Sequence, residues 1–244
     1  VEPNILILRN PGEYTYFDGK DITSALDSLG YSYTLRADVQ LTDEDFIGIN
    51  VYIDSAMSTN EDCGFVWQGT TKSAISNYMS NGGSVYFQTE NQRFNGCNQE
   101  KLDLMNQFIN DPTVRSGETI IGQSFMATSV SDSSNCVLSI PNDIAGKQIT
   151  AEATNTFDDS IDADSTIAST DGSPIGGIWS GRETTVCGLR IITYSDINND
   201  ENDGKILQNF IEFLANGCDS ECNECPENAE CFNPIEISNY ERIF

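Results

Sequence analysis

Short, nearly continuous apolar runs alternate with amphipathic segments through the first 90 residues. Residues 4–9 form the first apolar run, which is typical of a strand buried on both faces of a parallel sheet. In residues 21–30 the apolar side chains recur at helical spacing, and Gly30 ends the pattern. The same reasoning predicts strands over residues 31–37, 46–53 and 84–88 and a helix over residues 70–79. Strands that alternate with helices in this way predict β-α-β crossovers and a parallel sheet.

The pattern changes after a third helix, predicted over residues 102–109. Residues 117–180 are rich in Thr, Ser, Gly and Asp, and we expect an antiparallel excursion or a decorated sheet edge there. Their short β-like runs lie at residues 119–127, 136–140, 148–153 and 175–179. A long strand over residues 184–194 and an amphipathic helix over residues 205–214 complete the pattern.

The elements together predict one α/β domain over residues 1–216. We expect it to be doubly wound, with a mostly parallel sheet and a β-rich insertion at residues 117–180. Residues 217–244 form a cysteine-rich tail, which we expect to be a disulfide knot.

Composition narrows the function classes. The chain carries 12 Lys and Arg against 38 Asp and Glu, a net charge of −26. This charge excludes most nucleic-acid binding, because phosphate neutralisation needs a basic surface. No apolar run approaches the ~20 residues that span a bilayer, so we expect no membrane insertion. Histidine is absent from the sequence, which removes Ser-His-Asp and Cys-His catalysis and zinc sites that need histidine.

Eight cysteines, an even number in both the body and the tail, predict disulfides in an oxidising, extracellular compartment. The start Val1-Glu2-Pro3 is also what a processed secreted chain would show. A zinc site in the tail is the alternative, although its ligands would be closely bunched. In the body we expect Cys63–Cys97, since both residues follow neighbouring strands, and Cys136–Cys187. In the tail Cys218–Cys225 with Cys222–Cys231 is one of three connectivities.

Several of these segments resemble the class I glutamine amidotransferase-like superfamily. The resemblance covers roughly residues 4–216, and it is carried by the first strand and helix, residues 49–54, "SNYMSNGGSVYFQTEN" and "GLRIITYSDINNDENDGKILQNFIEFLAN". It implies a flavodoxin-like or glutamine-amidotransferase-like sheet. Members that act as amidotransferases carry a Cys at the turn after the strand matching residues 84–88, and a downstream His. Here Thr89-Glu90-Asn91 occupy that turn, Cys97 comes later and no His exists. The resemblance therefore implies the scaffold without that activity, so we expect no enzyme.

Carboxylates cluster where the predicted strands end. Ligands of open α/β sheets bind at the carboxyl ends of the strands, and these ends carry Asp54, Glu90 and Asp196. Asn198 and Asp200 continue an alternating series of oxygen-bearing side chains. Such a set suits calcium, which takes six to eight oxygen ligands. Two carboxylates would also suit glycoside hydrolysis. The third alternative is that these acidic residues form no site, because a strongly acidic protein has many Asp and Glu residues in its loops.

The two tryptophans are open to two interpretations. Trp67 and Trp179 could stack on sugars, although core packing is the more common role. The tail segment "CNECPENAECFN" resembles a fragment of an epidermal-growth-factor-like module.

After that segment the tail is rich in apolar residues: Ile235, Ile237, Tyr240, Ile243 and Phe244. A sequence of this kind frays or sticks unless something covers it. We therefore expect a secreted, non-enzymatic structural or cell-surface protein that assembles with copies of itself through the tail, as a filament or layer. The alternatives are a calcium- or carbohydrate-binding adhesion module and, further off, a secreted hydrolase that uses carboxylates.

Overall fold

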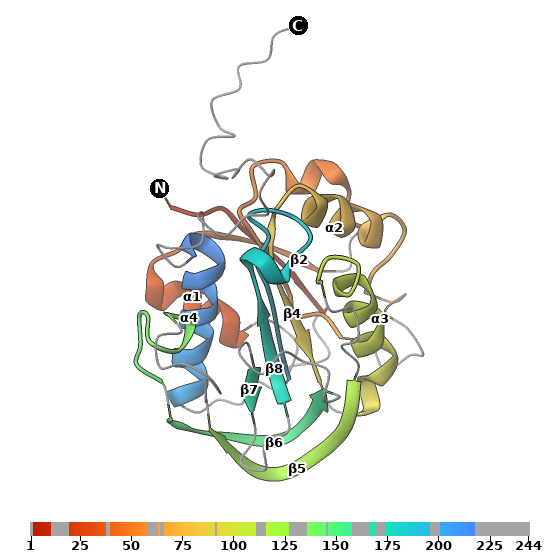
Figure 1. Ribbon diagram of the computed structural model, residues 1–244. Coiled ribbons are helices and arrows are strands. Elements are labelled where there is room, and N and C mark those ends of the chain that lie inside the picture. Colours follow the sequence, from red (N-terminus) through yellow and green to blue (C-terminus); the bar gives the residue numbers. More distant parts are fainter. Residues whose placement is uncertain are drawn as a thin grey trace, which may run out of the picture.

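A seven-stranded, mostly parallel sheet forms the centre of the molecule in the computed structural model (Figure 1). The structure describes residues 2–10, 20–37, 40–57, 63, 66–90, 92–110, 116–126, 136–144, 146–157, 166–168, 174–195 and 201–217. The strand order is β2-β1-β3-β4-β9-β8-β7. The pairs β2-β1, β1-β3, β3-β4 and β4-β9 are parallel, and the last two pairs are antiparallel. The α/β fold class predicted from the sequence is confirmed.

The main strands are short, and outside β2 most of their described residues are buried. Their bounds are β1 Ile5–Arg9, β2 Tyr33–Ala37, β3 Val51–Asp54, β4 Ser84–Thr89, β9 Ile191–Ser195, β8 Pro174–Trp179 and β7 Thr166–Ala168. Every residue of β3 and β4 is buried, whereas three of the five residues of β2 are exposed. The near-continuous apolar runs thus mark the central strands, as expected for a sheet that is covered on both faces.

Helices cover both faces of the sheet. The helices are α1 Lys20–Leu29, α2 Thr71–Ser80, α3 Asn95–Met105 and α4 Glu201–Asn216. Figure 1 shows α1 and α4 on one side of the sheet and α2 and α3 on the other. Two separate clusters of buried apolar side chains match these layers. At about 25 cal/mol per Å², burial on both faces is the main source of stability for such a fold.

Residues 117–180 contribute to two different structures. The strands β5 Ser116–Met126 and β6 Gln148–Phe157 pair antiparallel as a ribbon of their own, which curves across one end of the sheet (Figure 1). In contrast, β7 and β8 extend the main sheet as antiparallel strands beyond β9.

Two predicted strands are wrong in their extent. The strand predicted over residues 46–53 begins only at Val51 and ends at Asp54, because a 3-10 helix, η2 Asp43–Phe46, and a turn at Gly48 with φ 75° come first. In residues 184–194 only β9 is a strand. Gly188 has φ 81° and Thr184 forms an isolated bridge with Ile109, so the first half of that segment is a loop.

Two further predictions differ from the structure. Residues 136–140 contain the 3-10 helix η4 Cys136–Leu138 instead of a strand. The third helix begins at Asn95, seven residues before the predicted start at residue 102, and ends at Met105. Two 3-10 turns, η3 Gln92–Phe94 and η6 Gly181–Glu183, complete the described elements.

Candidate functional site

The carboxyl ends of β1 and β3 are closed by side chains that tie the two chain segments together. The Asn10 side chain donates to the carbonyl of Met57 at 2.7 Å and accepts from the Met57 N–H at 2.8 Å. Ser55 donates through both its N–H and its hydroxyl to the carbonyl of Leu8, each at 3.0 Å. The loop that leaves β3 is therefore held against the end of β1.

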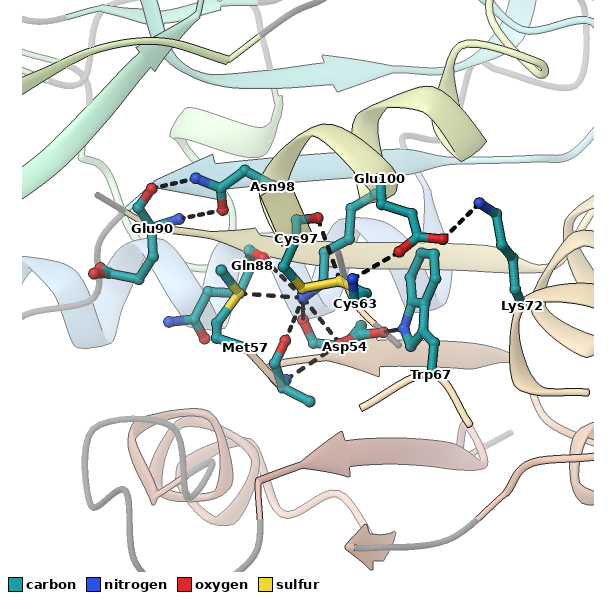
Figure 2. The surroundings of a disulfide bond; sticks show 12 residues. Asp54, Met57, Cys63, Trp67, Lys72, Gln88, Glu90, Cys97, Asn98 and Glu100 are labelled. Carbon is teal, nitrogen blue, oxygen red and sulfur yellow. Dashed lines mark hydrogen bonds and ion pairs between the residues drawn. A yellow bond between two sulfur atoms is a disulfide. The ribbon is translucent and has the colours of Figure 1, made fainter. Parts of the chain in front are cut away.

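Asp54, the last residue of β3, lies at the centre of this region and is fully buried. Its Oδ2 accepts hydrogen bonds from the Trp67 indole at 2.6 Å and from the Tyr52 hydroxyl at 2.9 Å. Its Oδ1 accepts from the N–H of Ala56 at 3.2 Å and forms an ion pair with the Lys101 ammonium at 3.0 Å. Figure 2 shows the carboxylate beside Trp67 and close to the Cys63–Cys97 disulfide.

Lys101 reaches this carboxylate from α3, and its side chain is also fully buried. Its Nζ donates to the carbonyls of Ala56 at 2.6 Å and Gln88 at 3.0 Å, in addition to the contact with Asp54. These three nearest oxygen acceptors match the three N–H bonds of an ammonium group, while the Met57 sulfur at 3.4 Å and the Asp54 carbonyl at 3.5 Å lie further away. One lysine side chain thus connects the end of β3, the loop after it and the end of β4.

Burial sets the protonation behaviour of the two groups that face Asp54. Desolvation lowers the pKa of the Lys101 ammonium, and the Asp54 carboxylate opposes this shift without cancelling it. Desolvation also raises the pKa of the Tyr52 hydroxyl well above its ordinary value, and the Asp54 charge adds to the increase. Tyr52 therefore remains a neutral donor to Asp54 over the physiological range of pH.

The predicted Cys63–Cys97 disulfide is confirmed, with the two Cα atoms 4.4 Å apart. It joins the loop after β3 to the first turn of α3. Glu100, three residues further along α3, accepts from the Cys63 N–H at 2.7 Å and pairs with Lys72 at 2.7 Å (Figure 2). The prediction succeeded because β3 and β4 are adjacent strands, so the segments that follow them leave the same edge of the sheet.

The turn after β4 is where enzymatic relatives of this fold would carry a nucleophile, according to the resemblance described above. Here Glu90 follows Thr89, and its N–H donates to the Asn98 side-chain oxygen at 3.0 Å. The Asn98 amide in turn donates to the carbonyl of Glu90. Cys97 lies on α3 and is half of a disulfide, so it offers no thiolate.

The residues predicted to hold calcium are not all within the described part of the chain. Asp54 and Glu90 are both buried, and the Asp54 oxygens are occupied by the donors given above. Asp196, Asn198 and Asp200 lie outside the described residues, so a calcium site there stays a prediction. Among the residues that the structure describes, no group of three His, Cys, Asp or Glu side chains is placed to hold a metal ion.

Both tryptophans are core residues. Trp67 is 5% exposed and donates to Asp54, while Trp179 is 3% exposed and packs over Gly177. Core packing is therefore confirmed for both, and neither is exposed for stacking on a sugar.

The described residues include no helix that is long and apolar enough to cross a membrane.

Other predicted residues remain untested. Cys187 is disulfide-bonded, but its pairing with Cys136 stays a prediction because the Cys136 side chain is outside the described set. The tail, residues 218–244, also lies outside it. The predictions for that segment concern the following residues: Cys218, Cys222, Cys225, Cys231, Ile235, Ile237, Tyr240, Ile243 and Phe244.

Lys101 is the residue that sequence reasoning missed. Its spacing carried a signal, since Cys97, Lys101 and Met105 follow one another at intervals of four and share one face of a helix. The structure buries all three. A helix predicted from residue 95 would have placed this lysine on a buried face and required an acidic partner for it.

Comparison with known proteins supports the fold. No protein-family model and no curated protein matches the sequence. Among solved structures, the mmIFT52 N-terminal domain is similar with a TM-score of 0.56 and 11% identity, covering 88% of this chain and 98% of that chain. A crystal structure of a ThuA-like protein from Parabacteroides merdae gives a TM-score of 0.54 and 11% identity, covering 89% of this chain and 90% of that chain. Both have class I glutamine amidotransferase-like folds, and this chain shares that fold.

Proposed function

We propose that this chain is a secreted, non-enzymatic structural or cell-surface protein that assembles with copies of itself, as a filament or layer, through residues 232–244. The glutamine amidotransferase-like domain serves as the rigid body of the subunit. Its disulfide-bonded cysteines support an extracellular location, where disulfides persist.

The observation that carries the non-enzymatic part is the Lys101–Asp54 ion pair. It occupies the carboxyl ends of β3 and β4, which is where open α/β sheets bind ligands. Both side chains are fully buried and their polar atoms are occupied by one another and by nearby donors and acceptors. A group that is buried in this way stabilises the sheet edge and cannot meet a substrate.

The sequence of the tail supports the assembly part. Five large apolar residues within ten positions would bury enough area to contribute several kcal/mol, at about 25 cal/mol per Å². A contact between the tail of one copy and the body of another is heterologous, and it propagates into a filament unless the rotation closes a ring. The net charge of −26 opposes association, so salt and divalent cations should promote it by screening.

We expect no glutaminase, esterase or peptidase activity above background. The reason is that the turn after β4 carries no cysteine and that Cys97 is bound to Cys63. The assay compares the full chain with a Cys97→Ser variant and a heat-inactivated sample. Reproducible activity that Cys97→Ser alone abolishes would overturn the non-enzymatic proposal.

Deleting residues 232–244 is expected to prevent assembly while the domain remains folded. Light scattering and negative-stain electron microscopy would compare the two chains at equal concentration. Sodium chloride and calcium chloride at matched ionic strength would separate screening from specific calcium binding. If the shortened chain forms particles as large as those of the full chain, the tail has no role in assembly and the proposal is wrong.

A further inference from the structure

The edge strand β2 is the least covered strand of the sheet for which burial is described. Among the described residues it pairs on one side only, with β1. Thr34, Leu35 and Arg36 are exposed, although consecutive residues of a strand point to opposite faces. The middle of β2 is therefore exposed on both faces, and one row of its backbone groups has no partner strand among the described residues. An edge of this kind is a template for pairing with a strand of another chain.

Leu35 makes this edge unusual. It is 38% exposed and is one of three large apolar residues that are exposed in the described part of the chain. Its pairing partner on β1 is Ile7, which belongs to the buried cluster beneath α1 and α4. Leu35 thus continues a buried apolar row to the open edge. Natural edge strands often carry charged residues that discourage pairing, and Leu35 offers an apolar side chain instead.

The body of the chain ends close to the start of this strand. Tyr31, two residues before β2, donates its hydroxyl to Glu212 at 2.6 Å, and the Asn216 amide donates to the same hydroxyl oxygen at 3.2 Å. Asn216 is the last residue of α4. Residues 218–232 can span at most about 50 Å when extended. The described part of the chain therefore ends near the start of β2, and the apolar residues that follow are close enough in sequence to reach the β2 edge of a neighbouring molecule.

The sequence of the tail matches the pattern of β2. In Ile235-Glu236-Ile237 the two isoleucines would share one face of a strand and Glu236 would lie on the other. On β2, Leu35 and Arg36 also point to opposite faces. Placing Glu236 opposite Arg36 puts an isoleucine opposite Leu35 in either the parallel or the antiparallel direction. Pro234 comes before the segment, where proline is tolerated at the start of an edge strand.

We propose that residues 235–238 of one copy add to the open edge of β2 in a second copy, and that this strand addition is the assembly contact. The inference rests on the proposed function and names its acceptor surface. Main-chain hydrogen bonds would provide affinity, while the contacts at Leu35 and Arg36 would fix the register.

The first test is Leu35→Lys in the full chain. It should raise the protein concentration needed for half-maximal assembly about tenfold or more, because a charge replaces an apolar contact at the edge. The matched control is Ile47→Lys, since Ile47 is 79% exposed in the turn that precedes β3; it should change that concentration less than twofold. Circular dichroism would confirm that both variants are folded.

The second test is a charge exchange. Arg36→Glu and Glu236→Arg should each weaken assembly, and the double variant should recover it. Arg36 also pairs with Asp45 on the surface, a contact whose loss has little effect on stability. If the double variant is no better than the single variants, Glu236 does not face Arg36 and the proposed register is wrong.

The outcomes separate this inference from the proposed function. If deleting residues 232–244 stops assembly and Leu35→Lys does not, the tail is required but β2 is not its acceptor. If neither change matters, both proposals fail. A synthetic peptide of residues 232–244 tests whether the tail instead binds the β2 edge of its own molecule. If the peptide binds the shortened chain while the full chain stays monomeric, each tail occupies its own β2 edge. Addition to a second copy is then excluded.

Discussion

Replacing Lys101 with methionine is expected to lower the free energy of unfolding by about 3–5 kcal/mol, as for other buried ion pairs that lose one partner. Methionine fills a similar volume, so the effect reports mainly on charge and hydrogen bonding. The Asp54 carboxylate would be left buried with only the neutral donors Trp67, Tyr52 and Ala56. The carbonyls of Ala56 and Gln88 would also lose the ammonium that they share. Urea unfolding at neutral pH measures the change.

Two further variants make this result specific. Lys72→Met removes a half-exposed lysine that pairs with Glu100, and its cost should be below about 1 kcal/mol. Combining Lys101→Met with Asp54→Asn removes both charges, and it should recover a large part of the loss. Equal effects of Lys101→Met and Lys72→Met would show that the buried pair does not hold the sheet edge together.

Removing the Cys63–Cys97 disulfide is expected to cost about 2–5 kcal/mol. The bond closes a loop with a sequence separation of 34 residues, and a loop of that length restricts the unfolded chain substantially. Cys63→Ala with Cys97→Ala is the suitable double variant, because both sulfur atoms are in a buried region where serine hydroxyls would need partners. The measurement is again urea unfolding, with the number of free thiols counted beforehand.

The loss has a structural consequence that can be tested separately. Without the disulfide, the loop after β3 keeps the hydrogen bond from Cys63 N–H to Glu100 and the contacts between Asn10 and Met57. Because these contacts do not replace the covalent link to α3, we expect faster amide exchange at residues 63, 66 and 67 and unchanged exchange in β1. A double variant as stable as the parent, within about 0.5 kcal/mol, would mean that these other contacts already fix the loop.

The sheet could be predicted from sequence because its central strands are buried on both faces. The ranges 4–9 and 84–88 contain the apolar runs 5–8 and 85–87, and the structure places these runs in β1 and β4. The prediction failed where turn chemistry overrode a similar run. Residues 46–53 are mostly apolar, but the 3-10 helix ending at Phe46 and the positive φ at Gly48 delay the strand, which runs over Val51–Asp54.

The site was only partly predictable. Asp54 and Glu90 do lie at the sheet edge, since that position follows from parallel strand order alone. The interactions of Asp54 cannot be predicted from strand order, because they depend on Lys101. This lysine lies on α3, which begins seven residues before the predicted start of that helix. Patterns within one element show which residues are buried. They do not show which buried charges meet across elements.

The mass of the full chain in solution, measured as a function of concentration, tests self-assembly most directly. Sedimentation velocity should show species well above the monomer mass of 26.8 kDa, increasing with protein concentration and with salt. A single monomeric species at every concentration, with and without added sodium or calcium chloride, would contradict the proposal that this protein assembles with copies of itself.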